Sequence, residues 1–129
     1  MAEESPSEVV KRFCQLDYEG ARLSSETYSA IQPLIAYPAE PGWDTAVGIK
    51  GYALKKEMIN GDVAEVMVEY EIDQIWPEGD LPSRQETFKL VKYGPAWKIQ
   101  EYIMYPRVSA IVLCKKHSQC SSWANKSPS

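Results

Sequence analysis

The chain has 129 residues, 44% of them hydrophobic and 25% charged, which fits one ordinary globular domain and excludes a disordered or fibrous chain. Its net charge of −4 is uneven, because residues 107–129 hold four basic residues and no acidic one, which leaves 10 basic against 18 acidic residues, or −8, on the rest. An acidic body argues against nucleic-acid binding, which needs a basic face.

Three cysteines are an odd number, so at least one of them is unpaired within the chain. We expect Cys14 to be a small buried hydrophobic residue rather than a nucleophile. Cys114 and Cys120 could form a disulfide in an oxidising compartment, or they could bind a metal together with His117. Zinc usually takes four ligands and no fourth is obvious nearby, so the sequence predicts no metal and no cofactor.

The sequence has no apolar run of membrane length and no leader pattern, so we expect a soluble protein that does not contact a membrane. The compartment stays open, since a leader could have been removed.

Two helices are expected at the N-terminus. Ser5-Pro6-Ser7-Glu8 combines a serine cap, a proline in the first turn and a glutamate for a capping box, which predicts a helix running to about Glu19. Gly20 lies close to its end. Ser24 caps a second helix, and Pro33 should bend or end it.

From Ala46 the hydrophobic period changes from helical to alternating, which predicts strands. Gly48 and Gly51 lie where the alternation slips, and they indicate a bulge in a strongly bent strand. Asn60-Gly61-Asp62 predicts a hairpin turn. Gly94-Pro95 marks a later turn, and Pro106 should end the last long strand, which begins at Ala96.

The strand after the hairpin turn alternates most cleanly, and only Gln74 breaks its inward row. Its inward side chains are those of Ala64, Val66, Val68, Tyr70, Ile72 and Trp76, and its outward acidic ones are Glu65, Glu69, Glu71 and Asp73. In the third strand Phe88 and Leu90 are in phase. The fourth strand is expected to carry Trp97, Ile99, Glu101, Ile103 and Tyr105 on one face.

This order of elements resembles the nuclear-transport-factor-2-like superfamily, the cystatin-like cone shared with ketosteroid isomerases and polyketide cyclases. The segments that carry the resemblance are FCQLDYEGARL, INGDVAEVMVEYEI and ETFKLVKYGPAWKI. The resemblance implies an α+β fold in which N-terminal helices pack in the concave face of a strongly curved antiparallel sheet. The domain would span residues 5–106, followed by an extension over 107–129 with a short helix or a further strand segment and a mobile tail.

The resemblance also implies a pocket, open at one end of the cone. Asp17 lies on the apolar face of the first helix and would look into this pocket, where a buried carboxyl group needs a partner or a proton. Arg84, two residues before Glu86, is one possible ion-pair partner. The candidate ligand-binding residues are Tyr70, Gln74, Glu86, Trp97, Glu101 and Tyr105.

Three interpretations of these residues stay open. Asp17 could be structural and accept hydrogen bonds from nearby loop amides, while Glu101 could lie where its strand meets water. Asp17 could instead be a general acid or base with a raised pKa, in an isomerase, cyclase or dehydratase that uses a tyrosine as hydrogen-bond donor. The domain could also be non-catalytic, either binding a small apolar molecule or acting as an interaction module through the outer face of its sheet. We favour binding of a small apolar or amphipathic ligand over catalysis, and we expect a homodimer.

Overall fold

The computed structural model describes residues 4–23, 25–37, 40, 46–76, 84–103 and 105–112. Of Ser25, Gln74 and Trp76 it describes only the backbone. The tail from residue 113, with Cys114, His117 and Cys120, lies outside the described residues, as does Ser24.

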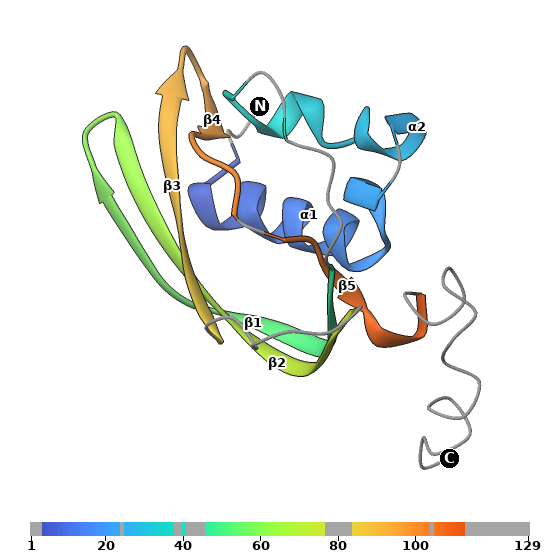
Figure 1. The fold of residues 1–129 in the computed structure, drawn as a ribbon. Coiled ribbons are helices and arrows are strands. Elements are labelled where there is room, and N and C mark those ends of the chain that lie inside the picture. Colours follow the sequence, from blue (N-terminus) through green and yellow to red (C-terminus); the bar gives the residue numbers. More distant parts are fainter. Residues whose placement is uncertain are drawn as a thin grey trace.

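The chain forms an α+β fold in which a strongly curled sheet surrounds the first helix (Figure 1). The helical elements are α1 (Pro6–Tyr18), η1 (Ala21–Leu23), α2 (Ser25–Tyr28) and η2 (Gln32–Leu34). The strands are β1 (Ala46–Asn60), β2 (Val63–Trp76), β3 (Gln85–Tyr93), β4 (Ala96–Ile99) and β5 (Arg107–Ser109). None of the helices in the described part of the chain is long and apolar enough to cross a membrane.

The sheet is mixed, with the strand order β4-β3-β2-β1-β5. Neighbouring strands from β4 to β1 are antiparallel, as the sequence predicts, but β5 runs parallel to β1. The expected antiparallel sheet is therefore correct for four strands only. Residues 107–109, which the sequence assigns to an extension, add the fifth strand at the edge, and residues 110–112 are helical.

Helix α1 begins as its sequence predicts. The Ser5 hydroxyl accepts a hydrogen bond of 3.1 Å from the Glu8 backbone N–H, and the Glu8 carboxylate accepts one of 2.8 Å from the Ser5 N–H. Gly20 adopts a φ of 95° just after the helix, a conformation that glycine tolerates at helix ends. The second helix is shorter than expected: α2 has one turn, and Pro33 lies within η2 instead.

The predicted bulge in β1 is present. The pairing with β2 shifts between Gly48 and Ile49, and again between Ile49 and Gly51. These two shifts place Ile49 opposite Ile72 and Tyr52 opposite Tyr70, so apolar side chains of opposite parity in β1 face the helix together. The strand bends without exposing its core residues.

The fourth strand ends earlier than predicted. It was expected to continue to Tyr105, but β4 stops at Ile99. Tyr105 has a φ of 69°, which no extended strand accommodates, and the Arg22 side chain takes the carbonyl of Ile103 as a hydrogen-bond acceptor. The Ile103 carbonyl therefore accepts a hydrogen bond from an arginine side chain and not from a neighbouring strand.

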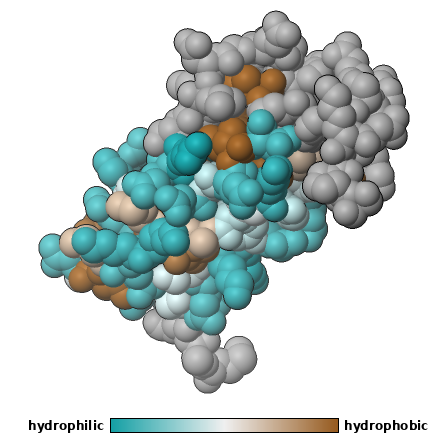
Figure 2. Space-filling model, turned by 90° about the horizontal axis from the view of Figure 1, so that it is seen from below, coloured by the Kyte–Doolittle hydropathy of each residue, from teal (hydrophilic) through white to brown (hydrophobic). Residues whose placement is uncertain are grey.

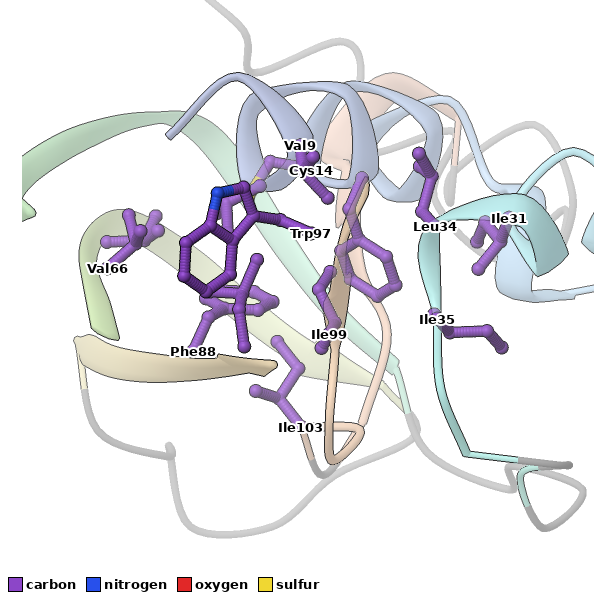
Figure 3. Close-up of a cluster of buried hydrophobic side chains, with 14 of the residues drawn as sticks. Val9, Cys14, Ile31, Leu34, Ile35, Val66, Phe88, Trp97, Ile99 and Ile103 are labelled. Carbon is purple, nitrogen blue, oxygen red and sulfur yellow. The ribbon is translucent and has the colours of Figure 1, made fainter. Parts of the chain in front are cut away.

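Apolar side chains from α1 and from the sheet pack together in the space between them (Figure 3). The Phe13 ring meets the Phe88 ring edge-on, with centroids 5.5 Å apart, and both side chains are fully buried. Val10, Val66 and Ile99 are also fully buried. The polar interior therefore lies toward the C-terminal end of α1, where Asp17 is located.

Candidate functional site

Asp17 lies in the last turn of α1 and is only 1% exposed. Its Oδ2 accepts two hydrogen bonds, one of 3.2 Å from Arg22 Nη1 and one of 3.0 Å from the backbone N–H of Arg107. The carboxyl group therefore joins the end of the first helix to the start of the last strand.

Arg22 follows α1 because the chain turns at Gly20 and brings η1 back beside the helix. Its Nε donates to Glu40 at 2.8 Å, and its Nη2 donates to the Ile103 carbonyl at 2.6 Å. Both members of the Arg22–Glu40 pair are buried. A buried guanidinium with carboxylates on two sides is well compensated.

Two tyrosines also contact Glu40. The hydroxyl of Tyr28 donates to Glu40 Oε2 at 3.0 Å, and that of Tyr37 donates to the same oxygen at 2.9 Å. Burial and, after it, the nearby Glu40 carboxylate raise the pKa of Tyr28 to about 12 and also raise the pKa of Tyr37, so both hydroxyls keep their protons.

Arg107 extends from β5 across the inside of the curled sheet and is 1% exposed. Its Nη2 donates to Glu86 on β3 at 2.6 Å, and its Nη1 donates to the Tyr105 carbonyl at 2.7 Å. The guanidinium carbon lies 5.3 Å from the centroid of the Tyr70 ring on β2, a cation–π contact. This side chain therefore links β5 to β3 over the two strands between them.

Together these residues form a buried charged cluster, which we define as Asp17, Arg22, Glu40, Glu86 and Arg107. Fully ionised, it holds charges of +2 and −3. The pKa of Asp17 is raised above its ordinary value, because burial raises it more than the charge of the neighbouring Arg22 lowers it. Burial lowers the pKa of Arg107. One proton on Asp17 would make the cluster neutral.

Asp17 Oδ1 differs from the other carboxyl oxygen, because it is buried and accepts no hydrogen bond from any described residue. Leaving such a group unsatisfied costs about 1–3 kcal/mol, and more when it is charged. Since both donors hold Oδ2, a proton on this carboxyl would sit on Oδ1. Oδ1 is therefore an unsatisfied hydrogen-bond acceptor when the carboxyl group is ionised, and an unsatisfied donor when it is protonated.

The structure brings together four of the residues singled out from the sequence: Asp17, Tyr70, Glu86 and Tyr105. The Tyr70 hydroxyl lies 3.9 Å from Cys14 Sγ, and burial raises its pKa well above the usual range.

Two of the other candidates lie elsewhere, and the position of the third, Gln74, is described for its backbone alone. Trp97 packs in the apolar core with Lys92 5.7 Å from its ring centroid, and Glu101 is exposed beyond the end of β4. The backbone of Gln74 belongs to β2, and its side chain is outside the described residues. Arg84 is exposed, and it is Arg107 that pairs with Glu86.

Sequence reasoning missed Arg22, Glu40 and Arg107. The signal for Arg22 was its place five residues after Asp17, just past a glycine that turns the chain back. Arg107 gave no local signal, since it contacts Asp17 from 90 positions away.

Within the described residues no group of three or more His, Cys, Asp and Glu side chains could hold a metal ion. Comparison of the chain with protein-family models, curated proteins and solved structures finds no significant match.

Proposed function

We propose that this chain is a small-molecule-binding domain of the nuclear-transport-factor-2-like type, with its ligand at the charged end of the cone. The observation that carries the proposal is Asp17 Oδ1, a buried carboxyl oxygen without a hydrogen bond from the described residues. Buried polar groups are normally satisfied, so each exception calls for an explanation. A ligand hydroxyl or amine would supply the missing hydrogen bond.

The superfamily assignment is part of the proposal. It is supported by the position of α1 inside a strongly curled sheet, with its capped N-terminus and its buried Asp17 near the C-terminus (Figure 1). The remaining wall of the site would come from Tyr70, which keeps its hydroxyl proton, and from the partly buried Tyr105. The aromatic rings of these two tyrosines, next to the charged cluster, suit a small amphipathic ligand with an apolar body and a polar group.

A matched pair of probes tests this proposal. Cyclohexanol and methoxycyclohexane have similar apolar bodies, but only the alcohol can donate to Asp17 Oδ1. At a pH above the folded-state pKa of Asp17, we expect ligand-observed NMR to detect the alcohol bound about tenfold more tightly than the ether, since a hydrogen bond to a charged group contributes about 1.5–3 kcal/mol.

The variant Asp17→Asn should lose this preference, while Asp73→Asn is the control. Asp73 also has a buried oxygen without a described hydrogen-bond partner, but it lies on β2 beside Lys50. Equal binding of alcohol and ether to the unmodified chain, or binding of neither, would contradict the proposal.

The raised pKa of Asp17 favours a second function, acid–base catalysis. A proton on Oδ1 could pass to a ligand oxygen, with the Tyr70 hydroxyl as a further donor. Catalysis would require Oδ1 alone to give and take the proton, because Oδ2 already accepts hydrogen bonds from two donors. A site-directed test is turnover of a bound ligand that disappears in Asp17→Asn while binding persists.

The outer face of the sheet supports a further proposal, that the chain forms a homodimer. Four large hydrophobic side chains near the β1–β2 hairpin are more than half exposed. Ile59 lies opposite the buried Ala64 and so belongs to the inner face. The other three are Met58, Val63 and Tyr93. Register places them on one face, because Met58 lies opposite Glu65, and Val63 opposite Val91. In Figure 2 brown atoms gather at the hairpin end of a mainly teal surface. Exposed apolar patches often mark interfaces.

A further inference from the structure

The ion pair between Arg107 and Glu86 is unequal. The Arg107 side chain is 1% exposed, whereas that of Glu86 is 27% exposed. The cation thus belongs to the interior, and its carboxylate partner reaches it from the rim of the sheet. Glu86 is the second residue of β3, close to the end of the ladder with β2, where the last register pair is Glu69–Gln85.

Arg107 is also held by contacts that do not involve Glu86. Its backbone is paired with β1 at Val47, its N–H is held by Asp17, and its Nη1 is held by the Tyr105 carbonyl. The Tyr70 ring supports the guanidinium from one face. Removing Glu86 would therefore leave a fixed, buried cation whose Nη2 has lost its carboxylate partner.

A buried cation needs an anion close by. The carboxylate of Glu86 and the carboxylate of a ligand could therefore compete for the same place beside Arg107. A ligand carboxylate on Nη2 would keep the charge balance of the cluster unchanged. Glu86, already partly exposed, would move into water at little cost in desolvation. A carboxylate also forms the strongest hydrogen bonds that a guanidinium makes.

We propose that Arg107 is the anion-binding group of the ligand site, that Glu86 occupies it in the free chain, and that the ligands are small organic carboxylates with an apolar body. The proposal rests on the proposed binding function, whose ligand class it narrows. It assigns Arg107 the carboxylate and leaves Asp17 Oδ1 for a hydroxyl or amine on the same molecule.

The test is rescue of a variant by a carboxylate. Glu86→Ala removes the carboxylate on Nη2 and leaves room for another, and it should lower the melting temperature by about 10 °C, since the buried Arg107 guanidinium loses one of its carboxylate neighbours. Hexanoate should restore most of this loss, and hexanol, which has the same chain but no charge, should restore much less. Hexanoate should also bind Glu86→Ala at least about tenfold more tightly than it binds the unmodified chain.

Glu69→Ala is the matched control, because Glu69 is a neighbouring glutamate whose ion pair with Lys55 is exposed. Hexanoate should not stabilise this variant more than it stabilises the unmodified chain. If Glu86→Ala does not fold well enough to measure, Glu86→Gln removes the charge with the shape retained and should show the same selectivity at reduced size.

Equal effects of hexanoate and hexanol on the Glu86 variants, or equal rescue of Glu69→Ala, would overturn the carboxylate proposal. In that case the cyclohexanol preference of the unmodified chain would still stand, since it depends on Asp17 and not on Glu86. Loss of that preference with carboxylate rescue intact would overturn the role of Asp17 instead.

Discussion

The backbone N–H of Arg107 donates a hydrogen bond of 3.0 Å to Asp17 Oδ2, across 90 positions of the chain. Through this contact the end of α1 is joined to β5, the edge strand of the sheet next to β1. Asp17 also holds Arg22, so one carboxyl oxygen connects three segments. Stability and ligand binding are expected to depend on the same side chain.

Replacing Asp17 with alanine should lower the free energy of unfolding by about 3–5 kcal/mol, because it leaves the buried Arg22 without one of its carboxylates and the Arg107 N–H without an acceptor. Urea denaturation at pH 7 measures the loss. Glu19→Gln is a control at the exposed end of the same helix, where a change within about 0.5 kcal/mol is expected. A loss below about 1 kcal/mol for Asp17→Ala would show that the contacts contribute little.

The pH dependence of stability should reveal the raised pKa of Asp17. Burial raises this pKa above 3.8 in the folded chain, so the folded state binds the proton more tightly than the unfolded state does. The stabilising contribution is therefore complete below pH 3.8 and is lost as the pH rises through the folded-state pKa. The difference in free energy of unfolding between the unmodified chain and Asp17→Asn should fall over that range.

Urea titrations of both proteins at a series of pH values measure this difference. A difference that stays constant, or that grows with pH, would show that Arg22 and the Arg107 N–H outweigh burial and hold the pKa at or below its ordinary value.

The sequence predicted the features of the fold that depend on neighbouring residues. The capping box at Ser5 and Glu8, the bulge near Gly48 and the turn at Gly61 each follow from a short local pattern. The inward row of β2 follows from simple alternation, and its described members from Ala64 to Tyr70 are buried.

The predictions that were wrong concern features of the fold that depend on contacts between distant parts of the chain. The early end of β4 follows from Arg22 binding the Ile103 carbonyl, 81 positions away. The parallel strand β5 has three residues and begins with an arginine, which in a sequence normally indicates exposure. The same non-local contacts make the charged cluster, so sequence reasoning found Asp17 without finding its partners.

Cys14 should be unreactive in the folded chain. Burial raises the pKa of its thiol to about 12, with the charge of Asp17 adding to the effect, so little thiolate forms near neutral pH. In a background with Cys114→Ser and Cys120→Ser, we expect iodoacetamide at pH 8 to modify Cys14 at least about 100-fold more slowly in the native protein than in urea.

Mass spectrometry of the alkylated chain over time measures both rates. Comparable rates in the native and unfolded chain would mean that the thiol is accessible, and would contradict the packing of Cys14 of α1 against Tyr70 of β2.

The hairpin-end patch of Met58, Val63 and Tyr93 leads to a prediction about assembly. Val63→Arg should convert the proposed homodimer to a monomer, because a charge buried in an interface without a partner costs several kcal/mol. Ala30→Arg is the control, since Ala30 is exposed after α2 on another part of the molecule. Sedimentation equilibrium over a range of concentrations gives the mass of each protein.

Three results are distinguishable. A dimer that only Val63→Arg dissociates supports pairing through the outer face of the sheet. A dimer that persists in Val63→Arg places the contact on another surface, where the outward acidic side chains of β2 in the two chains do not face each other. A chain that is monomeric without any substitution contradicts the homodimer, and the exposed Val63 would then need another partner, because three large hydrophobic side chains more than half exposed on one face are a costly surface to leave in water.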